Sequence, residues 1–331
     1  MNILVTGGNG FIGGHVVRRL LQAGHRVRVL AQYGTSLDPL RGMDAQVFFG
    51  DLRVPGSLFA CMNGVEAVCH LAAKVGDFGP ARPFYEVNVG GTRRLIEAAH
   101  LAGVRRFVLV SSLAVHRLRG SGIENGDEDW PRDHRDLPYA HSKILAEDAV
   151  MQAHATRRVE GVVVRPGLFP FGPQDRTSFL PLVRNLNRYA HVSQGGAVFC
   201  TAYVENLAHG IALAVEKPEA SGRTYVVADE HRITWRDFMD RLCDALKVPR
   251  IRRSVPFAIA LAAAGVAERV AAWSGRPPLL TRYRVRVAGL NCWFSSARAR
   301  QELGYRPIVS FEDGLARTVA WVASHPSWGL R

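Results

Sequence analysis

The chain has 331 residues, of which 47% are hydrophobic and 21% are charged, and this balance excludes a disordered or fibrous protein. The formal net charge is +13, and only four of the 42 basic residues are lysines. Such a charge favours anionic partners, but no basic motif interleaved with aromatic residues is present, so nucleic acid is not expected as a partner.

The N-terminus predicts a strand, a glycine turn and a helix. Residues 2–6 form an apolar run suited to a buried parallel strand, and residues 11–23 have helical periodicity. Between them, Gly7 suits a tight turn, Gly10 lets the backbone approach a pyrophosphate, and Gly13 allows close helix packing. Glycines also occur in plain structural turns, but the strand–helix context and the free N–H groups of the helix N-terminus favour a dinucleotide site.

Strands continue to alternate with helices as far as residue 165. The predicted strands cover 26–31, 44–50, 65–71, 107–111 and 159–165, and the helices lie near 56–62, 83–102 and 138–157. This order predicts an α/β fold, namely a Rossmann-type doubly wound parallel sheet with ligands at the carboxyl ends of its strands.

Beyond residue 165 the alternation ends. A helix near 203–216 and a strand at 224–228 are followed by helices at about 234–246, 256–273, 295–303 and 310–324. We therefore expect 1–165 to form the NAD(P)-binding domain and 203–228 to return to it. The ranges 166–202 and 229–331 would form a smaller, mainly helical C-terminal substrate-binding cap.

Three polar residues suggest the chemistry. Tyr139 and Lys143 lie four residues apart after Pro138, on one face of the predicted helix. A cationic lysine lowers the pKa of a nearby phenol, so Tyr139 could exchange a proton with a substrate oxygen while hydride moves at carbon. Ser112 ends the fifth strand and could hydrogen-bond that oxygen. Each pattern alone has a plain structural explanation, but the three together, in this order, are far more specific.

These motifs resemble those of an extended short-chain dehydrogenase/reductase, within the NAD-dependent epimerase/dehydratase superfamily. The match runs from residue 1 to about 322 and includes TGGNGFIG (6–13), GDL (50–52), HLAA (70–73), NVGGT (88–92), VSS (110–112), YAHSK (139–143) and RPG (165–167). The C-terminal half is similar to the 3β-hydroxysteroid dehydrogenase branch, in residues 278–282, 293–295, 302–307 and 312–315. That branch includes sterol-4α-carboxylate 3-dehydrogenases and bacterial 2-alkyl-3-oxoalkanoate reductases.

The resemblance implies that Ser112, Tyr139 and Lys143 are catalytic. Asn88 would help to order the site, the alternative being a helix-packing residue. The residues that it implies for cofactor binding are Gly7, Gly10, Phe11, Ile12, Gly13, Gln32, Asp51, Leu52, Leu71, Ala72, Ala73, Lys74, Ser111, Tyr139, Lys143, Pro166 and Gly167. Lys143 would also hold the nicotinamide ribose.

The cofactor is expected to be NADP(H) or NAD(H), with NADP(H) favoured. NAD-preferring enzymes generally place an acid at the end of the second strand, where it accepts hydrogen bonds from the ribose 2′-OH. This chain has Ala31-Gln32-Tyr33 there, so no carboxylate at that position repels a 2′-phosphate. Arg53 or Arg41 could reach the phosphate, although either could equally be a solvated surface charge.

The expected activity is the interconversion of a secondary alcohol and a ketone on a hydrophobic steroid-like or long-chain β-hydroxy or β-keto acid. The enzymatic alternative is a nucleotide-sugar epimerase, dehydratase or reductase with bound NAD(P). It is weakened because His116-Arg117 follows Val115 where sugar epimerases usually carry an aromatic-Gly pair, and because Gly167 stands where they tend to have asparagine. A binding protein without activity is a third reading, but such proteins usually lose the tyrosine or the lysine.

The remaining expectations concern partners and location. The apolar helix at 256–273 follows the arginines at 250, 252 and 253, which suits peripheral contact with an anionic membrane, although packing on the protein's own domain is favoured. Its most apolar part, Val255 to Ala267, is shorter than the ~20 residues of a membrane span. Five scattered cysteines without a CxxC pair predict buried thiols in a cytoplasmic protein, with no disulfide or metal site. The resemblance implies a homodimer that pairs the helices at 83–102 and 138–157.

Overall fold

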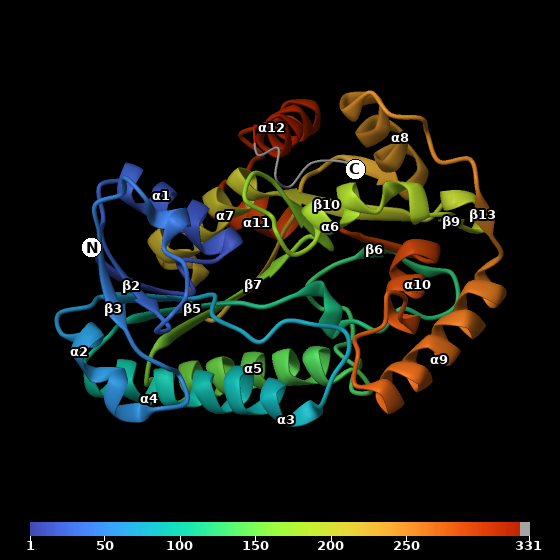
Figure 1. Cartoon of the computed structure of the whole chain (residues 1–331). Helices are drawn as coiled ribbons and strands as arrows, with labels where there is room; N and C mark the ends of the chain where they lie inside the picture. Colours follow the sequence, from blue (N-terminus) through green and yellow to red (C-terminus); the bar gives the residue numbers. More distant parts are fainter. Residues whose placement is uncertain (325–331) are drawn as a thin grey trace.

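A seven-stranded parallel sheet forms the centre of the computed structural model, which describes residues 1–324 (Figure 1). Across the sheet the strands are β11 (Thr224–Val227), β7 (Glu160–Pro166), β5 (Arg106–Val110), β4 (Ala67–His70), β1 (Asn2–Thr6), β2 (Arg26–Ala31) and β3 (Ala45–Phe49). The chain leaves β1 for β2 on one side and later enters β4 on the other, which is the switch point where doubly wound sheets bind ligands. The predicted fold class is confirmed.

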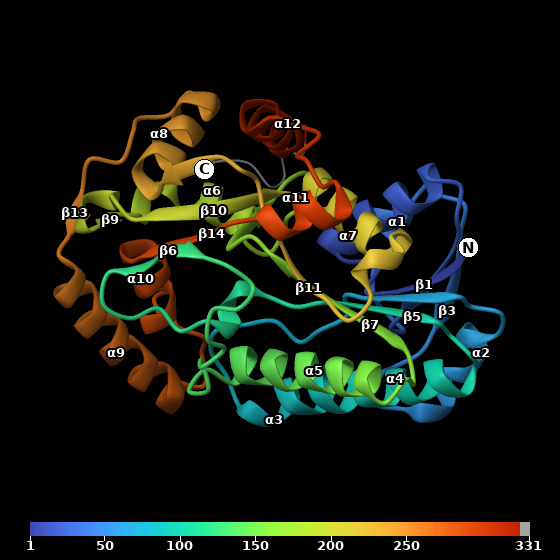
Figure 2. The ribbon, with the colours of Figure 1, turned by 180° about the vertical axis from the view of Figure 1, so that it is seen from behind.

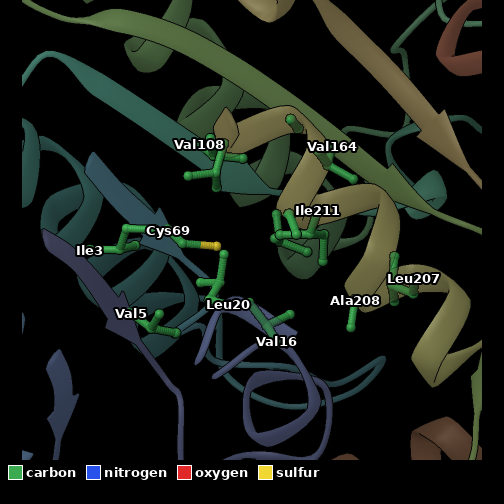
Figure 3. Packing of buried hydrophobic residues seen from close by; sticks show 14 of the residues in the cluster. Ile3, Val5, Val16, Leu20, Cys69, Val108, Val164, Leu207, Ala208 and Ile211 are labelled. Carbon is green, nitrogen blue, oxygen red and sulfur yellow. The ribbon is translucent and has the colours of Figure 1, made fainter. Parts of the chain in front are cut away.

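Helices cover both faces of this sheet because alternate strand residues point in opposite directions. Ile3 and Val5 face α1 (Phe11–Gln22) and α7 (Val204–Glu216), which pack side by side (Figure 3). Leu4, between them, faces the other layer, which contains α2 (Phe59–Met62), α4 (Thr92–Leu101) and α5 (Pro138–Ala155). Figure 2 shows α4 and α5 together beneath the sheet. Burying each such side chain contributes about 1.5–3 kcal/mol, so both layers hold the strands in place.

The C-terminal portion is helical and also contains a second sheet. Its helices are α6 (Phe179–Arg184), α8 (Trp235–Leu246), α9 (Phe257–Ser274), α10 (Arg282–Gly289), α11 (Ala297–Leu303) and α12 (Phe311–Ala323). The second sheet has five strands, β12 (Arg232–Thr234), β10 (Val198–Tyr203), β14 (Asn291–Phe294), β6 (Gly122–Gly126) and, paired with β10, β8 (Phe169–Phe171). A separate pair joins β9 (His191–Val192) to β13 (Ser254–Val255). The predicted cap residues 325–331 lie outside the described part.

The second sheet was not predicted, since no strand was expected within 166–202 or 229–331. Strand β6 lies within the range assigned to the cofactor domain, yet it pairs with β14 of the C-terminal portion. Strand β8 follows β7 after two residues, and Gly167 between them comes so close to β10 that a Cβ would lie 2.5 Å from Thr201 O. The two sheets therefore meet at the carboxyl edge of the parallel sheet.

Two predicted helices are divided in the structure. The periodicity predicts one helix over 83–102, whereas the chain forms α3 (Ala81–Phe84), a π-helix η3 (Tyr85–Gly91) and α4. The helix predicted near 56–62 is a 3₁₀ turn η2 (Pro55–Ser57) followed by α2. The other short 3₁₀ turns are η1 (Asp38–Leu40), η4 (Leu113–Val115), η5 (Leu186–Arg188), η6 (Ser193–Gly195) and η7 (Pro218–Ala220).

The five cysteines are buried and free, as predicted. Burial raises the pKa of Cys69 to about 12 and that of Cys61 to about 11, so these thiols stay protonated at neutral pH.

Candidate active site

The glycine turn after β1 packs so closely that its first and third glycines leave no room for a side chain. Gly7 has a φ of +70°, and a Cβ on it would lie 2.8 Å from the backbone nitrogen of Ala72. A Cβ on Gly13 would lie only 2.0 Å from the carbonyl oxygen of Gly7. The backbone N–H of Gly10 donates to the same oxygen at 2.9 Å. The turn therefore holds the start of α1 directly against the ends of β1 and β4.

This turn fits the pyrophosphate of a dinucleotide. No side chain caps the N-terminus of α1, so the first-turn N–H groups, including those of Phe11 and Ile12, remain available. Available N–H groups and the positive end of the helix dipole attract phosphate. Gly7, Gly10 and Gly13, with these two residues, are the ones that would hold the cofactor here.

Three residues that were predicted to bind the cofactor lie at the ends of β2 and β3. The Gln32 Nε2 donates to Asp51 Oδ2 at 3.2 Å, and the Arg53 Nη2 donates to the same oxygen at 2.6 Å. The hydrogen bonds from Arg53 hold the pKa of the Asp51 carboxyl below its usual range. Leu52 is buried beside this cluster. The structure thus brings Gln32, Asp51 and Leu52 together at one end of the site.

Two of the predicted residues after β4 donate hydrogen bonds from their backbone N–H groups to Thr6. The N–H of Leu71 donates to Thr6 O at 3.1 Å, and the N–H of Ala72 donates to Thr6 Oγ1 at 3.2 Å. Ala73 is half-buried and Lys74 is exposed. This loop therefore lies directly next to the glycine turn, where its four residues line the same edge.

Asn88 ties that loop to helix α5. It is 2% exposed and lies on the π-helix η3. Its Oδ1 accepts from Lys74 N at 2.7 Å, and its Nδ2 donates to Lys74 O and to Ser142 Oγ, both at 2.9 Å. No hydrogen bond in the described part joins Asn88 to Tyr139. The geometry agrees with an ordering role.

Ser112, Tyr139 and Lys143 meet where β5 ends. Ser112 follows the strand, accepts a hydrogen bond from Ala114 N at 3.1 Å, and lies close enough to the Tyr139 phenol to lower its pKa. Tyr139 and Lys143 lie one turn apart on α5, and the Lys143 Nζ donates to Val110 O at 2.7 Å. The predicted serine, tyrosine and lysine therefore share one site at the carboxyl edge of the sheet.

Burial controls the proton affinities in this group. It raises the pKa of the Tyr139 phenol, and the nearby Ser112 hydroxyl partly offsets this rise. It lowers the pKa of the Lys143 ammonium to about 8, although Glu147 acts in the opposite direction. A lysine poised near neutrality beside a buried phenol is suited to tune a proton-transfer group.

A buried ion pair between Arg165 on β7 and Glu147 stabilises α5. Glu147 is 1% exposed, and Arg165 donates to its two carboxylate oxygens at 3.0 and 2.7 Å. Burial alone would raise the pKa of this carboxyl, but Arg165 and Arg132 bring it below its ordinary value. Ser111 is buried between β5 and β7, where its N–H donates to Val164 O at 2.7 Å. Glu147 thus stays charged one turn beyond Lys143.

Pro166 and Gly167, the last of the predicted cofactor-binding residues, lie at the carboxyl edge of the parallel sheet. Pro166 ends β7, and the N–H of Gly167 donates to Val227 O at 2.9 Å. Gly167 lies directly against β10, because a Cβ there would collide with Thr201 O.

A polar chain inside the site was not predicted. His70 Nδ1 lies 2.7 Å from Thr6 Oγ1, and its Nε2 lies 2.9 Å from Thr92 Oγ1, which in turn donates to Asn88 O. Burial, with a smaller effect of the Lys143 charge, lowers the pKa of His70 to about 3, so the imidazole is neutral. The sequence feature that could have predicted these hydrogen bonds is the presence of two polar residues, Thr6 and His70, each at the carboxyl end of a buried strand.

Tyr283 on α10 was also missed. Burial raises the pKa of its phenol, and Tyr139 lies near enough to add to that rise. Thr281 Oγ1 donates to Asp77 Oδ2 at 2.6 Å and Arg284 Nη2 donates to Asp77 Oδ1 at 2.9 Å, so α10 is fastened to the loop after β4. The sequence did not reveal Tyr283 because the segment before it has no clear periodicity. Only tertiary contacts bring this tyrosine close to Tyr139.

These features define a class of protein. A parallel sheet of this order, a glycine turn after its first strand and a tyrosine–lysine pair beside a strand-end serine are the features of a dinucleotide-dependent dehydrogenase or reductase.

Comparison with known proteins identifies the family. A family model described as the 3-beta hydroxysteroid dehydrogenase/isomerase family matches residues 4–257. The 2-alkyl-3-oxoalkanoate reductase of Stenotrophomonas maltophilia (strain K279a) is 32% identical, over 97% of this chain and 99% of its own. The human sterol-4-alpha-carboxylate 3-dehydrogenase, decarboxylating, is 30% identical, over 95% of this chain and 86% of its own.

A solved structure of a different activity is also similar. The dTDP-glucose 4,6-dehydratase DesIV from Streptomyces venezuelae, with NAD and TYD bound, is 29% identical, with a TM-score of 0.79 over 99% of this chain and 98% of its own. The chain belongs to the 3-beta hydroxysteroid dehydrogenase/isomerase family, and it is an NAD(P)-dependent oxidoreductase with an extended short-chain dehydrogenase/reductase fold.

Replacing Gly13 with Ala should weaken cofactor binding. The new Cβ would lie 2.0 Å from Gly7 O, so the turn and α1 must separate. Overpacking of this kind costs about 1–3 kcal/mol, so we expect the dissociation constant for NADPH or NADH to rise by about tenfold to a hundredfold in a fluorescence titration. Gly196→Ala is the control, since no atom lies within 4 Å of its Cβ position. Equal affinity in Gly13→Ala and wild type would contradict the assignment.

Proposed function

We propose that this oxidoreductase interconverts a secondary alcohol and a ketone on a hydrophobic, steroid-like or long-chain β-hydroxy or β-keto acid. The observation that carries the proposal is the Tyr139 phenol, which lies beside Ser112 and one turn from the buried Lys143. The names of the two relatives support the substrate class, because each describes oxidation or reduction of a compound that bears a carboxylate.

Each polar residue has a distinct part in this proposal. The nicotinamide supplies or accepts the hydride. Tyr139 is the general acid/base, which passes a proton to or from the substrate oxygen. Ser112 orients that oxygen by a hydrogen bond. Lys143 in its charged form stabilises the Tyr139 phenolate, which burial alone disfavours, and holds the nicotinamide ribose.

A cavity beside α10, the helix that carries Tyr283, suits a substrate with an acidic group. It has a volume of about 430 Å³ and lies between α9, α10 and the loop 117–120. Phe257 and Leu261 contribute apolar surface, and Arg286, one turn beyond Tyr283 on α10, contributes a guanidinium. Arg117 also lines the cavity but pairs with Asp136, whereas Arg286 has no carboxylate partner within residues 1–324. Arginine in such a position suits a carboxylate.

The nucleotide-sugar activity remains the second candidate, on the strength of the likeness to DesIV. It differs in a measurable way, because epimerases keep their NAD bound through turnover. Arg117 stands in place of the glycine that those enzymes usually carry there, which favours the first candidate.

We further propose NADP(H) as the preferred cofactor. Ala31 and Gln32 end β2 without a carboxylate, and Asp51 nearby is paired with Arg53, so its charge is largely neutralised. Arg41 pairs instead with Asp38 on η1.

We also propose a homodimer in the cytoplasm. Helices α4 and α5 lie side by side beneath the sheet, where a partner could add its own pair (Figure 2). The buried free thiols suit a reducing compartment.

A spectrophotometric assay of the reduced nicotinamide tests the proposed activity. With NADP⁺ or NAD⁺, we expect turnover of a 3β-hydroxysterol that carries a 4α-carboxylate, or with NADPH turnover of a long-chain β-keto acid. The matched controls are the methyl esters, which lack the negative charge and should have a raised KM. If the enzyme turns over a nucleotide sugar without added dinucleotide and turns over none of these acids, the second candidate replaces the proposal.

Ala31→Asp tests the cofactor preference. A carboxylate at the end of β2 would repel a 2′-phosphate and accept hydrogen bonds from a free 2′-OH. We expect the ratio of kcat/KM for NADP⁺ to that for NAD⁺ to fall by about tenfold or more, corresponding to ~1.4 kcal/mol. Ala31→Asn controls for side-chain size. An unchanged ratio in Ala31→Asp would remove this argument for NADP(H).

A further inference from the structure

Contacts on two sides fix the position of Tyr283 on α10. On one side, Thr281 Oγ1 donates to Asp77 Oδ2 at 2.6 Å and Arg284 Nη2 donates to Asp77 Oδ1 at 2.9 Å. Asp77 belongs to the loop after β4, which borders the glycine turn. On the other side, the Tyr283 ring packs on the His134 imidazole, with ring centroids 5.9 Å apart and 34° between the ring planes. Tyr283 is therefore held between this loop and His134.

His134 is hydrogen-bonded to the turn that begins at Ser112. It is 6% exposed, its Nδ1 donates to Ala114 O at 2.8 Å, and its N–H donates to Val115 O at 3.2 Å. The N–H of Ala114 donates in turn to Ser112 Oγ at 3.1 Å. Burial lowers the pKa of His134, so the imidazole is neutral at neutral pH. Tyr283 therefore packs on an uncharged ring that is bonded to the same turn as Ser112.

The Tyr283 hydroxyl has no hydrogen-bond partner within residues 1–324. The side chain is half-buried, and its hydroxyl is not one of the fully enclosed, unpartnered polar atoms of the described residues. Asp77, the carboxylate whose charge acts on this phenol, already pairs with Thr281 and Arg284. Packing on His134 requires only the ring, for which a phenylalanine would be enough. The hydroxyl is therefore available to a ligand.

Tyr283 lies close to Tyr139 and stays protonated. Burial raises the pKa of the Tyr283 phenol, and Cys292, Tyr139 and Asp77 add to that rise. The phenol can therefore donate a hydrogen bond at neutral pH. Arg286 lies one turn further along the same side of α10 and has no carboxylate partner within residues 1–324. A neutral donor and a cation on one helix face suit an acidic group.

The reacting oxygen of the substrate leaves no acceptor for Tyr283. A ketone oxygen has two lone pairs, and in the proposed function Tyr139 and Ser112 donate to both. Tyr283 therefore needs a second oxygen of the substrate. In a β-keto acid the carboxylate carbon is two bonds from the reacting carbon, so its oxygens lie beside the reacting oxygen. A carboxylate also accepts stronger hydrogen bonds than a neutral group does.

We propose that Tyr283 is a specificity-determining residue, whose hydroxyl donates a hydrogen bond to the carboxylate of the substrate. This inference rests on the proposed function and names a group that recognises the acid. The hydrogen bond forms when the substrate binds and persists in the transition state, so it contributes to substrate affinity more than to the rate of hydride transfer. Tyr283 thus favours a β-hydroxy or β-keto acid over the same alcohol or ketone without the carboxylate.

A dead-end complex tests this recognition without turnover. With NADPH bound, 3-hydroxytetradecanoate cannot react, because the cofactor and the ligand are both already reduced. Its dissociation constant is measured from the NADPH fluorescence and compared with that of tridecan-2-ol, which lacks only the carboxylate. Tyr283→Phe should raise the dissociation constant of the acid by about tenfold to a hundredfold and leave that of the alcohol unchanged.

Two controls separate this role from packing. Phenylalanine keeps the ring on His134, so a purely structural Tyr283 predicts no difference between Tyr283→Phe and the wild type. Tyr189→Phe removes the hydroxyl of a tyrosine that is 40% exposed in the same C-terminal portion, and it should leave both dissociation constants unchanged. Turnover of 3-oxotetradecanoate with NADPH adds a second readout. Tyr283→Phe should raise KM by about tenfold or more, with kcat and the affinity for NADPH nearly unchanged.

The other outcomes overturn the proposal. Equal affinity of Tyr283→Phe and wild type for the acid would remove the hydrogen bond, and equal weakening of acid and alcohol would assign Tyr283 to packing. A fall in kcat at unchanged KM would make Tyr283 a positioning residue for Tyr139. Absence of acid binding by the wild type would contradict the proposal together with the proposed function. Weaker acid binding by Tyr283→Phe, without turnover of any β-keto acid by the wild type, would contradict the proposed function alone.

Discussion

The buried side-chain amide of Asn88 fixes the position of the loop after β4 relative to helix α5. It bonds both backbone groups of Lys74 in the loop after β4 and the hydroxyl of Ser142 on α5. A neutral His70 continues this network from Thr92 to Thr6 on β1, next to the glycine turn. Since these groups are buried, losing one partner would leave the other unsatisfied at a cost of about 1–3 kcal/mol. The cofactor edge and the Tyr139 helix therefore move as one unit.

Charge is distributed unevenly around that unit. Glu147, the buried carboxylate one turn beyond Lys143, is neutralised by Arg165, so it stabilises α5 without repelling a phenolate strongly. Lys143 is left with a backbone carbonyl as its hydrogen-bond partner and a pKa of about 8. Such a lysine can respond to an arriving ribose or phenolate, and this links cofactor binding to the proton affinity of Tyr139.

The sequence was informative where the chemistry is local. A glycine at 7 and another at 13 are required by backbone contacts that leave no space for a Cβ, and the four-residue spacing of Tyr139 and Lys143 follows from one helical turn. Continuous apolar runs also predicted the parallel strands to within a few residues.

Local sequence patterns could not predict which distant segments of the chain pair in the folded protein. Strand β6 contains two glycines and two polar residues and becomes a strand only because β14, far along the chain, pairs with it. The π-helix that presents Asn88 has ordinary helical periodicity, and α10 brings Tyr283 to Tyr139 through contacts with Asp77.

The most direct measurement is turnover by Tyr139→Phe, together with its affinity for NADPH. We predict that kcat falls by about 10²–10⁴-fold with the cofactor dissociation constant unchanged; full turnover by this variant would contradict the assignment of Tyr139 as the proton-transfer residue.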